Sequence, residues 1–253
     1  MTQPHPNSEA AHRTLQFRLR SLLLLTVMVA VVTAFAHSEY QRRRKQRMAA
    51  APWEQIGATV TFDAQSRIIK LEFQPGANSI VCDSDLVEIV KLDHLIELDF
   101  GGYLGGRAAI TDTGITHLRH LSKLESMNLD GTSVTGAGLS ELQELSRLRF
   151  LFLGSTGITG RDLVHLKHLP NLRGLWLNHT KINDDDLELL KNHVASLSGL
   201  EILHLAATEI TDNGLIHLEE MSHLDVLRVN GPGVSETAMR SLQEKMPETE
   251  IWD

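Results

Sequence analysis

The sequence repeats one pattern about every two dozen residues, and this periodicity restricts the possible folds more than any other feature. Seven stretches share the order apolar-x-x-apolar-x-apolar. They begin, at spacings of 27, 29, 24, 24, 28 and 24 residues, at Ile68, Leu95, Leu124, Leu148, Leu172, Leu200 and Leu224. Such a period predicts a solenoid of stacked units. One unit alone buries too little apolar surface to be stable, so the repeats must share a continuous core.

Each repeat divides into a short strand and a short helix. The x-apolar-x-apolar part alternates as a strand with one buried face does, and apolar residues three positions apart then predict a helix. The stretches Thr111–Gly114 and Thr211–Gly214 read Thr-Asp-x-Gly, which offers a Thr N-cap and an acid that suits the helix dipole. A further threonine follows the strand in four repeats, and we expect it to hydrogen-bond the backbone between adjacent coils. These threonines are Thr132, Thr156, Thr180 and Thr208.

The pattern L-x-x-L-x-L-x-x-T-x-I-T-D-x-G-L-x-x-L-x-x-L resembles the ribonuclease-inhibitor-like class of the leucine-rich repeat family. It is especially similar to the repeats of F-box receptor proteins and of many bacterial membrane-anchored proteins. The resemblance covers about residues 68–253 and implies an α/β solenoid, a right-handed horseshoe segment of about seven repeats. The repeat at Ile68 lacks the threonine, and those at Leu95 and Leu172 carry insertions. No F-box precedes the repeats, so a ubiquitin-ligase role is not carried over.

The segment ahead of the repeats is apolar and flanked by arginines. Residues 21–36 carry no charge, Arg18 and Arg20 precede them, and residues 42–47 read RRRKQR. We expect a disordered, basic tail at 1–20, a single transmembrane anchor at 21–38 and a basic linker at 39–57. A cleaved signal peptide ending at Ala36 is the alternative. The charges do not decide which side of the membrane the repeats face.

Both ends of the solenoid need caps. Residues 58–73 read as two alternating runs around a polar turn, which predicts a hairpin whose first part, 58–67, caps the domain at 68–253. The last residues, PETEIWD, predict a short edge strand with Ile251 in a core column.

Composition argues against several functions. The first 50 residues hold eight Lys and Arg and two acids, which leaves 16 basic and 30 acidic residues in the rest. A domain this acidic is a poor match for nucleic acid. Cys82 is the one cysteine, so an intrachain disulfide is excluded. Neither a nucleophile motif nor paired metal-spaced cysteines occur, so we expect no enzyme and no cofactor.

Three residues of each strand should point away from the core, onto the concave face of the sheet. We name two columns of this face. The middle column contains Glu72, Asp99, Asn128, Phe152, Trp176, His204 and Arg228. The preceding column contains Lys70, Glu97, Ser126, Phe150, Gly174, Ile202 and Val226.

The predicted partner-binding site lies in these columns. Phe150, Phe152 and Trp176 fall on adjacent strands and should form one aromatic patch, since strands lie about 4.8 Å apart. Polar residues border it, as is usual for a binding surface. The bordering site residues are Asp99 and Asn128 on one side and His204 and Arg228 on the other. The alternative is that aromatic residues only favour strands and cover a neighbour, with Gly174 leaving room for the Trp176 ring.

Two further patterns could indicate sites. The pairs His117/His120 and His165/His168, with Glu141 and Glu144 between them, could form a metal-binding band on the convex side. Repeats place like residues in like columns without any metal, so we expect a solvated surface. Residues 101–106, GGYLGG, follow a strand as phosphate loops do, but lack the G-K-[ST] ending. We expect a flexible insertion there.

The sequence as a whole predicts a non-catalytic, membrane-anchored module that binds a protein or peptide on its concave sheet. A bacterial inner or plasma membrane is the expected location, with contact to the membrane through residues 21–36. The alternative is a structural, envelope-organising repeat protein without a discrete ligand.

Overall fold

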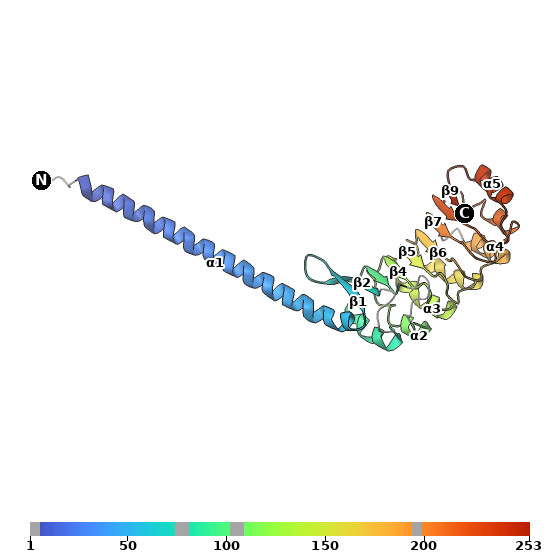
Figure 1. The fold of residues 1–253 in the computed structure, drawn as a ribbon, viewed down its shortest axis with the longest axis horizontal. Helices are drawn as coiled ribbons and strands as arrows, with labels where there is room; N and C mark the ends of the chain where they lie inside the picture. The colour runs from blue at the N-terminus through green and yellow to red at the C-terminus, as the bar shows by residue number, and fades with distance from the viewer. Residues whose placement is uncertain (1–5, 74–80, 102–108, 194–198) are drawn as a thin grey trace. The chain divides into compact units, whose positions relative to one another are not determined.

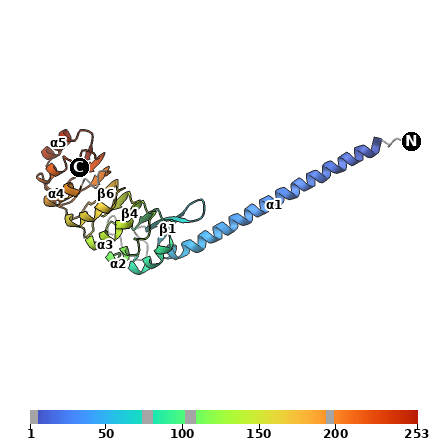
Figure 2. The same cartoon turned by 180° about the vertical axis from the view of Figure 1, so that it is seen from behind.

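The computed structural model describes residues 6–73, 81–101, 109–193 and 199–253. The chain divides into two compact units, Met1–Ala49 and Ala50–Asp253. The first unit consists of most of one helix, and the second contains the whole sheet and the remaining helices (Figures 1 and 2).

The first helix, α1, runs without interruption over Pro6–Gln55. The sequence instead predicts a tail and a linker on either side of the apolar segment, and both are helical where the structure describes them. The linker is rich in Arg, Gln and Ala, which favour a helix. Glu39 adds ion pairs one turn away, to Arg42 at 2.7 Å and to Arg43 at 3.3 Å.

The second unit is built on one nine-stranded sheet whose strands follow one another in sequence order. The β1–β2 pair is antiparallel, and every later pair is parallel. The strands are β1 (Ala58–Phe62), β2 (Ile68–Phe73), β3 (Glu97–Asp99), β4 (Ser126–Asn128), β5 (Phe150–Phe152), β6 (Gly174–Trp176), β7 (Ile202–His204), β8 (Val226–Arg228) and β9 (Glu250–Trp252). The segments at Leu124, Leu148 and Leu172 thus enter one sheet, as a shared core requires.

Short helices line the side of the unit opposite the sheet (Figures 1 and 2). Half of those in the described residues are 3₁₀ helices rather than α-helices, a form that is frequent in connecting segments. The α-helices are α2 (Asp112–Ile115), α3 (Gly136–Glu141), α4 (Asp184–His193) and α5 (Glu236–Lys245). The 3₁₀ helices are η1 (Asp83–Lys91), η2 (Leu142–Glu144), η3 (Gly160–His168) and η5 (Gly214–His217).

The core lies between the sheet and the helices and runs from coil to coil. The central residue of each strand from β2 to β8 is at most 1% exposed, for example Leu151 and Leu175. The helical leucines meet them from the other side, for example Leu163 and Leu166. Each repeat therefore shares its apolar face with both neighbours.

Three of the four ladder threonines are buried and Thr156 is half-buried, but the predicted hydrogen bonds between coils are wrong. Thr132, Thr156, Thr180 and Thr208 each donate through Oγ1 to the carbonyl three residues earlier, at 2.5 to 2.8 Å. Each hydroxyl thus closes a turn within its own coil, because that carbonyl lies nearer than the next coil.

Aspartates make the side-chain links between coils. Asp112, the first residue of α2, accepts from Thr135 in the next coil, from the backbone N–H at 2.8 Å and from Oγ1 at 2.6 Å. Asp83, Asp184 and Asp212 repeat this arrangement with the next N-cap. For Asp112 and Asp212, the sequence predicts only an interaction with the dipole of their own helix. They also satisfy the orphan N–H groups of the following one.

At two other junctions between coils, the carboxylate belongs to the following coil rather than to the preceding one. Asp162 accepts from its own N-cap, Thr159, at 2.8 Å, and the preceding coil has Gly136 at the position that Asp112 occupies one coil earlier. A Cβ on Gly136 would lie 1.9 Å from the Asp162 Oδ1 atom. Asp186 and Gly160 form the second such pair. Each of these junctions therefore holds one carboxylate, and a glycine faces it because there is no room for a side chain.

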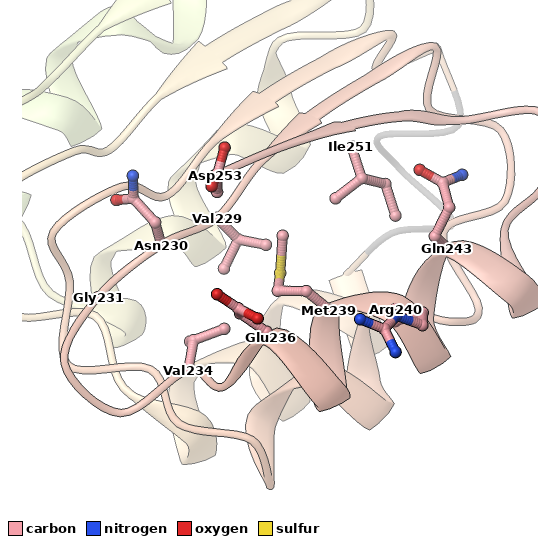
Figure 3. Close-up of a pocket in the computed structure, with 10 residues that line it drawn as sticks. All are labelled: Val229, Asn230, Gly231, Val234, Glu236, Met239, Arg240, Gln243, Ile251 and Asp253. Atoms are coloured by element: carbon pink, nitrogen blue, oxygen red, sulfur yellow. The ribbon is translucent and has the colours of Figure 1, made fainter.

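The two ends of the core are covered unequally. At the first end, Trp53 from the last turn of α1 is 5% exposed and belongs to the core, so the cap includes this turn as well as the predicted hairpin. At the other end, Val234, Met239 and Ile251 are only partly buried. They line a hollow of about 510 Å³ between α5 and β9, shown in Figure 3. Ile251 does pair with Leu227, as the sequence predicts.

Because each of these junctions between coils holds one carboxylate that faces a glycine, we expect two substitutions that exchange their positions to compensate each other. Asp162→Gly alone should destabilise by about 1–3 kcal/mol, because Thr159 loses the acceptor for its N–H group. Gly136→Asp alone should also destabilise, because two carboxylates would share one space. Together they recreate the pairing of Asp112 with Gly138, so the double variant should be more stable than the sum of the single effects by about 1–2 kcal/mol. Urea unfolding of the full chain measures this coupling, and additive effects would contradict this expectation.

Candidate functional site

The structure places the concave residues in the register that the repeat predicts. Parallel pairing joins Asp99 to Asn128, Asn128 to Phe152 and Phe152 to Trp176. It continues from Trp176 to His204 and from His204 to Arg228. The middle column is therefore one continuous row across the sheet. The role of these residues in binding stays a prediction.

The aromatic patch, Phe150, Phe152 and Trp176, is in place. The Phe152 and Trp176 rings stack with centroids 4.0 Å apart and planes inclined by 16°. Phe150 is tilted against Trp176 at 6.4 Å and 58°. All three side chains are half-buried. The patch is thus partly covered by its own members and still offers apolar surface on the concave side.

Gly174 provides the space for this packing. A Cβ at this residue would lie 2.5 Å from Cζ3 of Trp176 and 2.9 Å from Cδ1 of Phe150. The indole ring therefore lies back over its own strand, as the absent side chain allows. This geometry orients the ring, and a preoriented aromatic loses little conformational freedom on binding.

A hollow of about 410 Å³ continues from the patch toward the last strand. It extends over β6 to β9, and its lining includes a tryptophan on each of the two outer strands. Its lining residues are Trp176, Ile202, Leu203, His204, Val226, Arg228 and Trp252. Trp252 is 52% exposed and pairs with Arg228, which puts it in the middle column. The sequence-based site omits Trp252, although the repeat spacing of 24 residues from Arg228 identifies it.

His204 differs from its predicted role as an exposed border residue. It is 8% exposed, and its Nε2 atom is buried without a hydrogen-bond partner among the described residues. Burial lowers the pKa of His204 to about 4, and the charges of Arg228 and His179 add to this effect. The imidazole is therefore neutral at physiological pH and forms part of the wall of the hollow. Arg228, by contrast, is exposed.

The opposite side of the patch is acidic. Glu97 is exposed and Asp99 half-buried, and burial raises the pKa of Asp99. Asp130 is buried, and its Oδ1 atom accepts from the Gly154 N–H at 2.6 Å. Burial raises the pKa of Asp130 to about 6 against the opposing effect of that hydrogen bond. The concave face therefore carries carboxylates at β3 and just after β4, whereas Arg228 on β8 carries a guanidinium.

The other sequence patterns do not form a site among the described residues. The convex His/Glu band does not converge, since no three His, Cys, Asp or Glu side chains of the described ranges are placed to hold a metal ion. Most of the predicted loop at residues 101–106 falls outside the described ranges. So does most of the insertion in the repeat that begins at Leu172, which comprises residues 192–199.

Comparison of the coordinates with solved structures identifies the fold. Internalin C2 from Listeria monocytogenes matches with a TM-score of 0.52 at 24% identity, over 73% of this chain and 70% of the internalin. The chain has a leucine-rich repeat fold. Internalin InlF from the same organism matches with a TM-score of 0.41 at 17% identity, over 75% of this chain and 70% of the other. No protein-family model matches the sequence, and no curated protein does.

Asp130→Asn tests the electrostatics of the acidic side. The raised pKa means that folding disfavours the charged carboxylate of Asp130. This free-energy cost to folding is present above about pH 6 and disappears as the pH falls toward the ordinary carboxyl pKa near 4. Asn keeps an oxygen acceptor for Gly154. The variant should gain about 1–3 kcal/mol at pH 7.5 and little at pH 4.5. Thermal unfolding at both values measures the difference, and a variant that is less stable than the parent at pH 7.5 would contradict it.

Proposed function

We propose that this protein is a non-catalytic interaction module, anchored in a membrane, that binds a protein or peptide on its concave sheet. The observation that carries the proposal is the aromatic patch with the adjoining hollow, set on a sheet whose other face is buried from β2 to β8. Rigid aromatic anchors bordered by polar groups are the usual centre of a recognition surface. Sites on regular strands also hold their geometry better than sites on loops.

The convex side offers less for recognition. Its large exposed apolar residues are spread over three helices, at Val87 and Val90 in η1, Leu189 in α4 and Ile216 in η5. Single exposed apolar residues are common on soluble surfaces and do not mark a site. Among the described residues, only the concave face combines aromatic rings and a hollow with an acidic border and a cationic border.

The proposed anchor is the apolar segment of α1. The part of this helix from Leu22 to Gln55 is long and apolar enough to cross a membrane, and none of its most apolar stretch is buried. The arginines on both sides suit lipid headgroups. The resemblance to bacterial membrane-anchored repeats supports a bacterial inner or plasma membrane as the location. The same resemblance supports assignment of the repeats to the ribonuclease-inhibitor-like class.

Site-specific photo-crosslinking in cells tests the concave site. A photoreactive residue in place of Asn128 should give a discrete adduct, because Asn128 borders the patch, whereas one in place of the convex Arg161 should not. Phe152→Ala with Trp176→Ala should abolish the adduct. Thermal stability should fall only modestly, because both side chains are half-buried on the sheet surface and lie outside the core. An adduct that survives both substitutions would contradict the aromatic patch as the binding site, and no adduct at all would favour a structural role without a discrete ligand.

Membrane extraction tests the anchor separately. The full chain should stay in the membrane pellet after alkaline carbonate treatment, and its intact mass should include residues 1–36. Val27→Asp with Val31→Asp should release it, because two charges within a span oppose insertion by about 2.5–3.5 kcal/mol each. A mature protein that begins after Ala36 would show instead that this segment is a signal peptide.

A further inference from the structure

The hollow between Trp176 and Trp252 carries an inference about the partner's chemistry, and this inference rests on the proposed function. Its lining includes Ile202 on β7 and Val226 on β8, which lie between Trp176 on β6 and Trp252 on β9. Its volume of about 410 Å³ is within the range of pockets that hold small ligands or side chains. This lining suits a large apolar side chain.

Arg228 gives the hollow its charge. The guanidinium is exposed, and no carboxylate of the described residues lies within ion-pair distance of it. Lys70, the other cation of the two concave columns, is already paired with Glu97 at 3.1 Å and with Glu72 at 3.6 Å. His204 contributes no charge at neutral pH, since its imidazole is buried and neutral. Arg228 is therefore the cation of this face that is left for a ligand.

The rest of the concave face restricts where an acidic group can bind. Glu97 and Asp99 lie at the far side of the aromatic patch and would repel a carboxylate there. The same acidic border attracts basic or neutral groups. A chain that crosses the face would therefore place its acidic residue over β8 and keep acids away from β3.

We propose that the hollow binds an internal segment of a partner protein in which an aspartate or glutamate lies next to a large apolar residue. The apolar side chain lies between Trp176 and Trp252, and the carboxylate pairs with the Arg228 guanidinium. An internal segment fits because the hollow opens into the aromatic patch, over which the partner chain continues. Arginine suits this role because its planar fork can hold both oxygens of a carboxylate.

A peptide library tests the proposal with the full-length protein in detergent micelles. The library displays random peptides of about twelve residues, and enriched sequences are then synthesised with amidated C-termini. We expect enriched peptides to carry Asp or Glu within two positions of Leu, Phe or Trp. Replacing that acid by its amide should weaken binding about five- to tenfold. Arg228→Gln should weaken binding by the same factor, with no further loss when both changes are combined.

Charge reversal and a matched control complete the experiment. Arg228→Glu should abolish binding of the acidic peptide and accept the same peptide with Lys in place of the acid. The convex Arg161→Gln should change nothing. Fluorescence polarisation of labelled peptides gives each dissociation constant.

Three other outcomes would each contradict a different part of the proposal. Peptides that lose affinity with Trp176→Ala but not with Arg228→Gln would leave the proposed function standing and overturn the acidic partner. Peptides recognised only through a free C-terminal carboxylate would overturn the internal segment. A library that yields no peptide sensitive to either residue would overturn the inference, while the photo-crosslinking result would still decide the proposed function.

Discussion

The structure depends on stacking of coils that cannot fold alone. Each three-residue strand from β3 to β8, such as β5, hydrogen-bonds to a neighbour on both sides, and the buried leucines of successive coils belong to one core. The interior is thus continuous along the unit, and its stability arises at the junctions between repeats. The carboxylates at these junctions stabilise the stack further, because each accepts from a backbone N–H group that a helix start would otherwise leave unpaired.

This construction separates stability from recognition. Core columns such as that of Leu151 and Leu175 fix the backbone, while the columns facing outward are free to vary. The aromatic patch and the hollow occupy those outward columns, and the strand spacing sets the distances between their side chains. A change at Arg228 or Trp252 therefore alters the surface with little effect on the interior. The polarity of the face, acidic near Asp99 and cationic at Arg228, follows from the same freedom.

The repeat predicts most of the fold because its period encodes which residues share a column. The pairing of Phe152 with Trp176 and of Ile251 with Leu227 follows from spacing alone. The side-chain hydrogen bonds do not follow from the spacing, because they depend on which acceptor lies nearest. The threonine hydroxyls bond within their own coils, whereas Asp112 accepts from the next coil. The burial of His204 also depends on three-dimensional packing, which the repeat spacing does not encode. The site could have included Trp252, whose position the spacing already fixes.

Hydrogen exchange of the full chain tests the central claim, cooperative stacking, most directly. The amides that join neighbouring coils include those of Arg149, Arg173 and Glu201. If the repeats share one interior, these amides should exchange through a common opening with similar free energies, clearly slower than exposed amides of the convex turns. They should also respond together to one destabilising substitution in the core, such as Leu151→Ala. Free energies that differ strongly from coil to coil, with only the substituted coil affected, would show that the repeats are stable individually and contradict this account.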